Sequence, residues 1–316
     1  MNSTASTIEK IMSTSDQSYW HSAVYQQTAL IVLGVIFVAG IINFILRKNN
    51  QYSMVAWASL KSWLLMAPVM FILMGFGSPN PIIVLTLLAI YGAKVFFQIM
   101  GMFHKSAFVI ICYLGIIGLG LSCYFDNLTY YNEMPMIVLG LSCLVPLFKK
   151  DYKNMIQYIS LTLLGFIFLG WSFLHLGLIL NFENGIYQVM YLIILTEFCD
   201  NTNLAISGYF GGEKFIPELN SRRTVSSTMI SILLTLLLAY GMRHLLPDRS
   251  DKYWLASGVL AAAGGLIGDL VMAVVRKDAG VKTVGPFIIG RGDFLQRMDR
   301  LIFVAPIFYF VMLALK

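Results

Sequence analysis

Long apolar runs separated by short polar segments dominate this chain. An α-helix needs about 20 apolar residues to cross a bilayer. Candidate runs lie near 27–46, 54–75, 81–99, 107–124, 135–147, 155–180, 185–206, 225–246, 254–275 and 301–315. The fifth run is short and flanked by proline, so a re-entrant segment is the alternative there. The pattern predicts an all-α fold, a polytopic transmembrane helical bundle of about ten spans.

The composition supports this prediction and excludes several other classes of protein. Of the 316 residues, 58% are hydrophobic and 12% are charged, whereas about a quarter of a soluble domain is charged. A soluble enzyme and a disordered chain are therefore excluded. The four cysteines form no C-x-x-C pair and the net charge is only +6. We expect neither a cysteine metal site nor a nucleic-acid partner.

The distribution of Lys and Arg predicts the orientation, because cytoplasmic loops carry an excess of these residues. If the N-terminus faces outward, fifteen of the 22 Lys and Arg residues share one side of the membrane. With one span more or one span fewer, the Lys and Arg residues would no longer gather on one side of the membrane. Segments 207–224 and 276–300 are then the two large cytoplasmic loops.

Polar residues divide the chain into two regions, 1–180 and 181–316. The first consists mostly of hydrophobic helices. Within it, His175 has no second ligand at helical spacing, so its expected role is an interhelical hydrogen bond. Lys61 and Lys94 lie near span ends, where long side chains reach the interface. In the second region, acidic and basic residues recur at membrane depth.

The acidic residues of the second region lie within apolar helices. Glu197, Asp200 and Asn203 follow one another at three-residue spacing and so share a helix face. Asp269 follows two clusters of small residues, 261–265 and Gly268, that allow helices to approach closely. A carboxylate at such depth normally faces a wet cavity and has a partner. The alternative for each is a structural hydrogen bond or ion pair.

The basic residues of this region lie in the two predicted loops. The first loop holds Lys214, Arg222 and Arg223, and the second holds Arg276, Lys277, Lys282, Arg291 and Arg297. Lys and Arg both bind phosphate, the first as a point charge and the second as a two-pronged donor. Asp278, Asp293 and Asp299 alternate with the cations of the second loop. Together with a divalent cation, these groups could hold a polyphosphate.

Two stretches carry a family resemblance. The C-terminal signature of the phosphatidate cytidylyltransferases, or CDP-diacylglycerol synthases, resembles GDLVMAVVRKDAGVKTVGPFIIGRGDFLQRMDRL. Its matching or equivalent positions include Asp269, Arg276, Lys277, Lys282, Arg297 and Asp299. The family's acidic helix, Gly-Lys loop and S-P-x-K-T motif resemble LTEFCDNTNLAISGYFGGEKFIPELNSRRT, through Asp200, Lys214, Pro217, Arg223 and Thr224. The resemblance spans about 190–312, so region 181–316 is the cytidylyltransferase-like one.

This resemblance implies transfer of a cytidylyl group from CTP to a lipid phosphate, with pyrophosphate released. The implied catalytic residues are Asp269, Lys277 and Lys282. The implied nucleotide or phosphate ligands are Asp200, Asn203, Lys214, Arg222, Arg223, Arg276 and Arg297. Mg²⁺ is the implied cofactor, held by Asp269 and Asp299. Gln296 replaces an acidic metal ligand of the family, and we expect Asp293, three residues earlier, to supply a carboxylate instead.

Other functions remain open at this stage. Gln296 and Arg291 favour a non-catalytic relative that binds lipid or nucleotide. A CTP-dependent lipid kinase, or a cytidylyltransferase for another alcohol phosphate, would use similar charges. A transporter is disfavoured because the polar groups cluster at one membrane face. The expected partners are CTP, phosphatidate or another lipid phosphate, and membrane lipids, with a homodimer left open. The expected location is the bacterial inner (cytoplasmic) membrane, with the active face cytoplasmic.

The orientation can be tested by cysteine labelling of intact cells. In a background without the native cysteines, we predict that a membrane-impermeant maleimide does not label Arg223→Cys or Lys282→Cys from outside, because both loops face the cytoplasm. Arg249→Cys, in a segment predicted on the opposite side, is the positive control. Labelling of position 223 or 282 from outside would contradict the orientation.

Overall fold

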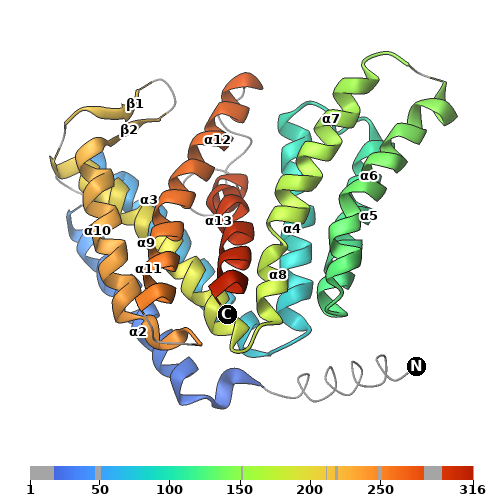
Figure 1. The fold of residues 1–316 in the computed structure, drawn as a ribbon. Helices are drawn as coiled ribbons and strands as arrows, with labels where there is room; N and C mark the ends of the chain where they lie inside the picture. The colour runs from blue at the N-terminus through green and yellow to red at the C-terminus, as the bar shows by residue number, and fades with distance from the viewer. Residues whose placement is uncertain are drawn as a thin grey trace.

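The computed structural model describes residues 18–46, 51–150, 152–210, 212–217, 220–247, 251–280 and 294–315. In this part the chain forms a bundle of roughly parallel and antiparallel helices (Figure 1). The first half contains the short 3₁₀ turn η1 (Tyr19–His21), α2 (Ala23–Leu46), α3 (Gln51–Gly75), α4 (Asn80–Ile99), α5 (Ser106–Tyr124), α6 (Leu128–Lys149), α7 (Met155–Gly165), the π-helical turn η2 (Phe166–Ser172) and α8 (His175–Leu180).

The second half of the described chain contains the remaining helices. They are α9 (Gly185–Phe210), α10 (Val225–Gly241), α11 (Asp251–Val259), the π-helical turn η4 (Leu260–Gly264), α12 (Gly265–Asp278) and α13 (Phe294–Leu315), with the 3₁₀ turn η3 (Arg243–Leu245) after α10. Between α9 and α10 lies an antiparallel hairpin of β1 (Lys214–Ile216) and β2 (Asn220–Thr224). The sequence pattern did not predict this hairpin.

The helices occur where the apolar runs predict them, because each run must bury its backbone polar groups within itself in lipid. In the described part of the chain, seven helices are long and apolar enough to cross a membrane. The fifth predicted run lies in α6, an unbroken helix of 22 residues despite Pro135 and Pro146, which favours a full span over a re-entrant segment. The prediction of an all-α polytopic membrane bundle is confirmed; the number of spans stays a prediction.

Large apolar side chains cover the outside of the bundle as well as its core. Leu30 on α2 and Leu87 on α4 are 72% and 61% exposed, as expected for side chains that contact lipid. Inside, Tyr131 of α6 and His175 of α8 are fully buried, and the Tyr131 hydroxyl lies 3.3 Å from His175 Nδ1. The predicted interhelical hydrogen bond of His175 is therefore confirmed.

Several predicted loops lie at the same end of the bundle. The hairpin, the end of α12 and the start of α7 lie at the top of Figure 1, whereas the C-terminus lies at the opposite end. This arrangement places the hairpin before α10 and the C-terminal end of α12 at the same end of the bundle. That this surface is the cytoplasmic one stays a prediction.

Helices α12 and α13 approach each other very closely at Gly268. A Cβ atom at this position would overlap the carbonyl oxygen of Asp299 and would lie 3.0 Å from the Cα of Arg300. Neither obstacle is a flexible side chain, so only glycine permits this approach. The contact brings the second turn of α13 against the first turn of α12, and with it Asp299 and Arg300 near Asp269.

We predict that Gly268→Ala destabilises the protein by about 1–3 kcal/mol, because the helices must separate to admit the methyl group. Thermal unfolding in detergent measures the effect. Gly34→Ala in α2 is the matched control, since its Cβ would meet no atom within 4 Å. Equal unfolding temperatures for the two variants would show that the close approach at Gly268 is not required.

Candidate functional site

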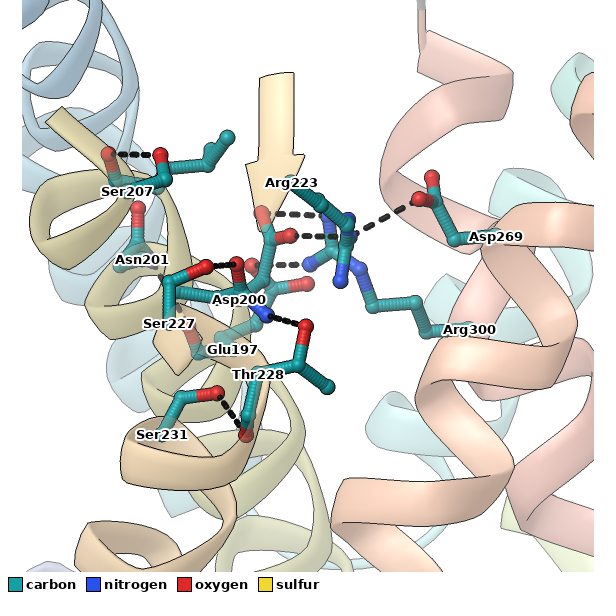
Figure 2. A network of polar contacts seen from close by, with 12 residues as sticks. Glu197, Asp200, Asn201, Ser207, Arg223, Ser227, Thr228, Ser231, Asp269 and Arg300 are labelled. Atoms are coloured by element: carbon teal, nitrogen blue, oxygen red, sulfur yellow. Dashed lines mark hydrogen bonds and ion pairs between the residues drawn. The ribbon is translucent and has the colours of Figure 1, made fainter. Parts of the chain in front are cut away.

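A buried cluster of charged side chains lies between α9, α12, α13 and the end of β2 (Figure 2). It contains Arg223 from β2 and Arg300 from α13. The carboxylates that face these arginines are Glu197 and Asp200 from α9 and Asp269 from α12. All five side chains are at most 7% exposed, so the charges lie inside the bundle.

Asp200 is the centre of this cluster because it bridges the two arginines. Its Oδ1 accepts a hydrogen bond from Arg223 Nη2 at 2.6 Å, and its Oδ2 lies 2.5 Å from Arg300 Nη2. Arg223 Nη2 also lies 2.8 Å from Asp269 Oδ2. Asp200 thus connects β2 to α13, and Asp269 connects β2 to α12.

Glu197 extends the cluster by one helical turn. Its Oε2 lies 3.3 Å from Arg300 Nη1 and accepts a hydrogen bond from the indole N–H of Trp63 at 3.0 Å. Since Trp63 belongs to α3, the network reaches across from the C-terminal helices to the first half of the bundle.

A second ion pair lies at the contact of α12 with α13. Arg276 Nη1 donates to Asp299 Oδ2 at 2.6 Å, and Asp299 is fully buried. Arg276 is in the last turn of α12, where a cation is stabilised by the carbonyl end of the helix. The pair therefore joins the end of one helix to the beginning of the other.

Hydrogen bonds of hydroxyl groups hold the end of β2, which carries Arg223, in place against α9 and α10. Thr224 caps α10, with its Oγ1 accepting from the Ser227 backbone N–H at 3.1 Å and the Ser227 hydroxyl accepting from the Thr224 N–H at 3.2 Å. Ser227 also donates to Asn203 Oδ1 at 2.9 Å, and Asn203 Nδ2 donates to Thr228 Oγ1 at 3.1 Å. These bonds attach the start of α10 to α9 directly beside Asp200.

The two buried arginines retain donor capacity beyond their ion pairs. Within the described part of the chain, the Nε atoms of Arg223 and Arg300 are buried and have no hydrogen-bond partner. A small cavity of about 10 Å³ touches Asp200, Asn203, Arg223 and Arg300, which is room for about one water molecule. Guanidinium groups pair with carboxylates and phosphates, and here three carboxylates, Glu197, Asp200 and Asp269, already face the two arginines.

The structure brings some of the predicted site residues together. Asp200, Arg223 and Asp269 form one network, Arg276 and Asp299 form the adjoining pair, and Asn203 lies in the hydroxyl network. Lys214 on β1 and Lys277 at the end of α12 are exposed. Lys282 and Asp293 lie outside the described residues, as do the side chains of Arg222 and Arg297.

Sequence reasoning missed Arg300 as a member of the site. It counted Arg300 as a loop cation, because this residue directly precedes the apolar run 301–315. The sequence places Glu197 at membrane depth but does not assign it to the site, and it gives no signal for Trp63. A usable signal did exist, since a carboxylate at that depth requires a cationic partner and Arg300 adjoins an apolar run.

Fold and site define an integral membrane protein whose charged centre is built from the C-terminal helices. The chain belongs to the cytidylyltransferase family, whose sequence profile matches residues 57–315. The match includes residues 57–75 of α3 and every helix that contributes to the cluster.

Individual proteins that are similar to this chain match a shorter part of it than the family profile does. The chain is 30% identical over 130 residues to the uncharacterized protein YnbB of Escherichia coli, an alignment that covers 41% of this chain and 44% of the relative. Phosphatidate cytidylyltransferases of Haemophilus influenzae and Synechocystis are 26% and 29% identical, over 40% and 43% of this chain. These alignments cover 45% and 46% of the two relatives, so the chain matches less than half the length of each.

We predict that Arg300→Met destabilises the protein by about 3–5 kcal/mol, because it leaves the buried Asp200 and Glu197 without one of their cationic partners. Arg243→Met is the matched control. Arg243 makes a cation–π contact with Tyr240 at 4.1 Å, which at an exposed site is worth about 0.5–1 kcal/mol. Thermal unfolding in detergent compares the two, and a loss for Arg300→Met no larger than the control's would contradict the proposed importance of the cluster.

Proposed function

We propose that this protein is a CTP-dependent cytidylyltransferase that converts a lipid phosphate, with phosphatidate as the first candidate, to a CDP-lipid with release of pyrophosphate. The observation that carries the proposal is the pair of buried arginines, Arg223 and Arg300, whose Nε groups lack a partner among the described residues. They lie inside a bundle of membrane-spanning helices in a chain of the cytidylyltransferase family. The space beside them holds about one water molecule, so binding of a lipid phosphate requires the cluster to open.

The proposed reaction needs no nucleophilic side chain. An oxygen of the lipid phosphate attacks the α-phosphorus of CTP in line, and pyrophosphate leaves from the opposite side. Catalysis then consists of positioning both substrates and neutralising phosphate charge. Buried arginines held rigidly by carboxylates serve this purpose, because they need little rearrangement when charge develops.

We assign roles to the remaining predicted site residues from the family resemblance and from the elements that carry them. Lys214 and Arg222 on the hairpin, with Arg223, are assigned to the triphosphate of CTP, and Asp200 and Asn203 orient that end of the site. Arg276, Lys277 and Lys282 are assigned to the lipid phosphate, because they belong to α12 and the segment that follows it. Arg297 completes the phosphate-binding set from the beginning of α13.

Magnesium is the proposed cofactor, and the donor set suits it. Mg²⁺ prefers oxygen ligands and is usually held by one or two carboxylates together with substrate phosphates. Among the described residues no three His, Cys, Asp or Glu side chains form a ready-made metal site, so Asp269 and Asp299 would share the ion with the phosphates, with Asp293 as a third carboxylate. When bound, the cation supplies charge neutralisation at the phosphates.

A non-catalytic relative that binds lipid or nucleotide is the second candidate. The observation that favours it is the pairing of Asp269 with Arg223 and of Asp299 with Arg276, because both proposed metal ligands already have cationic partners. In either case, we place the site at the cytoplasmic face of a bacterial inner membrane. The activity assay below also tests for a CTP-dependent lipid kinase. A homodimer stays a prediction.

The deciding experiment incubates the purified protein and Mg²⁺ with CTP and a panel of lipid phosphates. With CTP labelled in the cytidine, formation of a labelled CDP-lipid with stoichiometric pyrophosphate supports the proposal. With γ-labelled CTP and a lipid alcohol in place of the lipid phosphate, formation of a labelled lipid phosphate and CDP without pyrophosphate would identify a kinase. CTP or lipid binding without any product would identify the non-catalytic relative.

We predict that Asp269→Asn lowers Mg²⁺-dependent turnover at least about a hundredfold, a loss of about 2.7 kcal/mol of transition-state stabilisation. The fold should persist, because Arg223 keeps Asp200 as its partner. Asp251→Asn is the control, since Asp251 is exposed at the start of α11. Unchanged turnover of Asp269→Asn would make Asp269 a structural residue.

A further inference from the structure

The connection between α6 and α7, residues 148–156, combines positive charge with exposed apolar side chains, and we call it the basic turn. It lies at the same end of the bundle as the β1–β2 hairpin (Figure 1). Three of its residues are exposed lysines: Lys149, Lys150 and Lys153. Phe148 and Ile156 are 83% and 84% exposed, the highest values among the large apolar side chains of the described residues.

We infer that the basic turn binds the phosphate groups of anionic phospholipids in the surrounding membrane, with phosphatidylglycerol as their representative. This assignment is independent of the proposed reaction, because the basic turn belongs to the first half of the chain. It rests on three observations: the charge at this end of the first half, the depth of the turn in the membrane, and the apolar side chains beside the lysines.

The charge at this end of the first half is mostly of one sign. In the described residues of the first half, Asp126 and Glu133 are the acidic ones, and both lie at the start of α6, about 33 Å of helix away from its end. Asp151 of the basic turn lies outside the described residues. A fourth cation joins the three lysines, because Lys105 Nζ lies 4.8 Å from the centre of the Tyr158 ring on α7. Clusters of four or more basic residues at the end of a membrane helix attract anionic lipids.

The depth of the basic turn follows from the outer face of α6. This face carries four exposed apolar side chains: Ile137, Leu141, Leu144 and Phe148. They are four, three and four residues apart, so they share one side of the helix. Such a stripe on a membrane-spanning helix contacts the hydrocarbon of the bilayer. The lysines begin one residue after the stripe ends, which places their ammonium groups at the level of the lipid head groups.

The apolar side chains distinguish a lipid-binding surface from a signal for orientation alone. An excess of Lys and Arg orients a membrane protein by charge, and that role needs no large apolar neighbours. Yet Phe148, Tyr152 and Ile156 are 83%, 69% and 84% exposed. Such exposure is unfavourable in water and favourable where rings and aliphatic chains lie just below the head groups. The basic turn therefore fits a partner with phosphates above an apolar layer, which is the surface of an anionic membrane.

Fluorescence quenching by spin-labelled lipids tests the inference on the full chain without its native cysteines. A fluorophore is attached at Tyr152→Cys, and the protein is placed in phosphatidylcholine vesicles with a small fraction of spin-labelled phosphatidylglycerol or spin-labelled phosphatidylcholine. We expect phosphatidylglycerol to associate with the labelled turn at least about fivefold more strongly at low salt. This preference should fall several-fold in about 1 M salt, which screens charges beyond about 3 Å.

The same fluorophore at Met136→Cys is the matched control. Met136 is 71% exposed and lies on the same helix, near its opposite end. Because the lysines are far from this position, we expect equal quenching by the two lipids there.

Two triple variants separate the charge of the turn from its structure. Replacing Lys149, Lys150 and Lys153 with glutamine should abolish the preference for phosphatidylglycerol, whereas replacing them with arginine should retain it. The glutamine variant keeps twelve of the fifteen Lys and Arg residues predicted on that side of the membrane, so its orientation should persist. An undiminished preference in the glutamine variant would overturn the inference.

Three lipid results in the wild type decide the assignment. Stronger association of phosphatidylglycerol than of phosphatidylcholine supports it. Equal association of the two would overturn it and would leave the turn to water or to a protein partner. Enrichment of spin-labelled phosphatidate alone would also overturn it, because the turn would then be a substrate site. The proposed reaction is tested separately by the formation of a CDP-lipid.

Discussion

The arrangement of the C-terminal helices depends on the bridge that Asp200 makes between Arg223 and Arg300. Two guanidinium groups buried side by side would repel each other strongly in a low-dielectric interior, and a single carboxylate with one oxygen on each removes that repulsion. Because the three residues come from α9, β2 and α13, the bridge also determines how these elements meet. Asp269 and Glu197 then complete the pairing on either side.

Buried ion pairs contribute little net stability, since the cost of removing charges from water offsets most of their attraction. A cluster of this size inside a membrane bundle is therefore better explained by function than by stability. The close approach of α12 and α13 at Gly268 serves the same purpose, because it places Asp269 on one helix opposite Asp299 and Arg300 on the other.

The candidate site could be predicted only in part from the sequence. Asp200 and Asp269 stand out as carboxylates within apolar runs, and Arg223 and Arg276 as cations near them. Arg300 was overlooked because a cation at the border of an apolar run looks the same in a sequence whether it faces water or a buried carboxylate. Trp63 gave no signal at all, since its contact with Glu197 joins residues 134 positions apart.

The positions of the helices were decided by the sequence alone, because a run of about 20 apolar residues has no other stable arrangement than a helix in lipid. The all-helical membrane class and the C-terminal location of the charged residues followed from the same pattern. The partner of each charge and the hairpin that carries Arg223 were decided by tertiary structure. They depend on which faces of α3, α9, α12 and α13 meet, and that choice is set by packing between residues far apart in the chain.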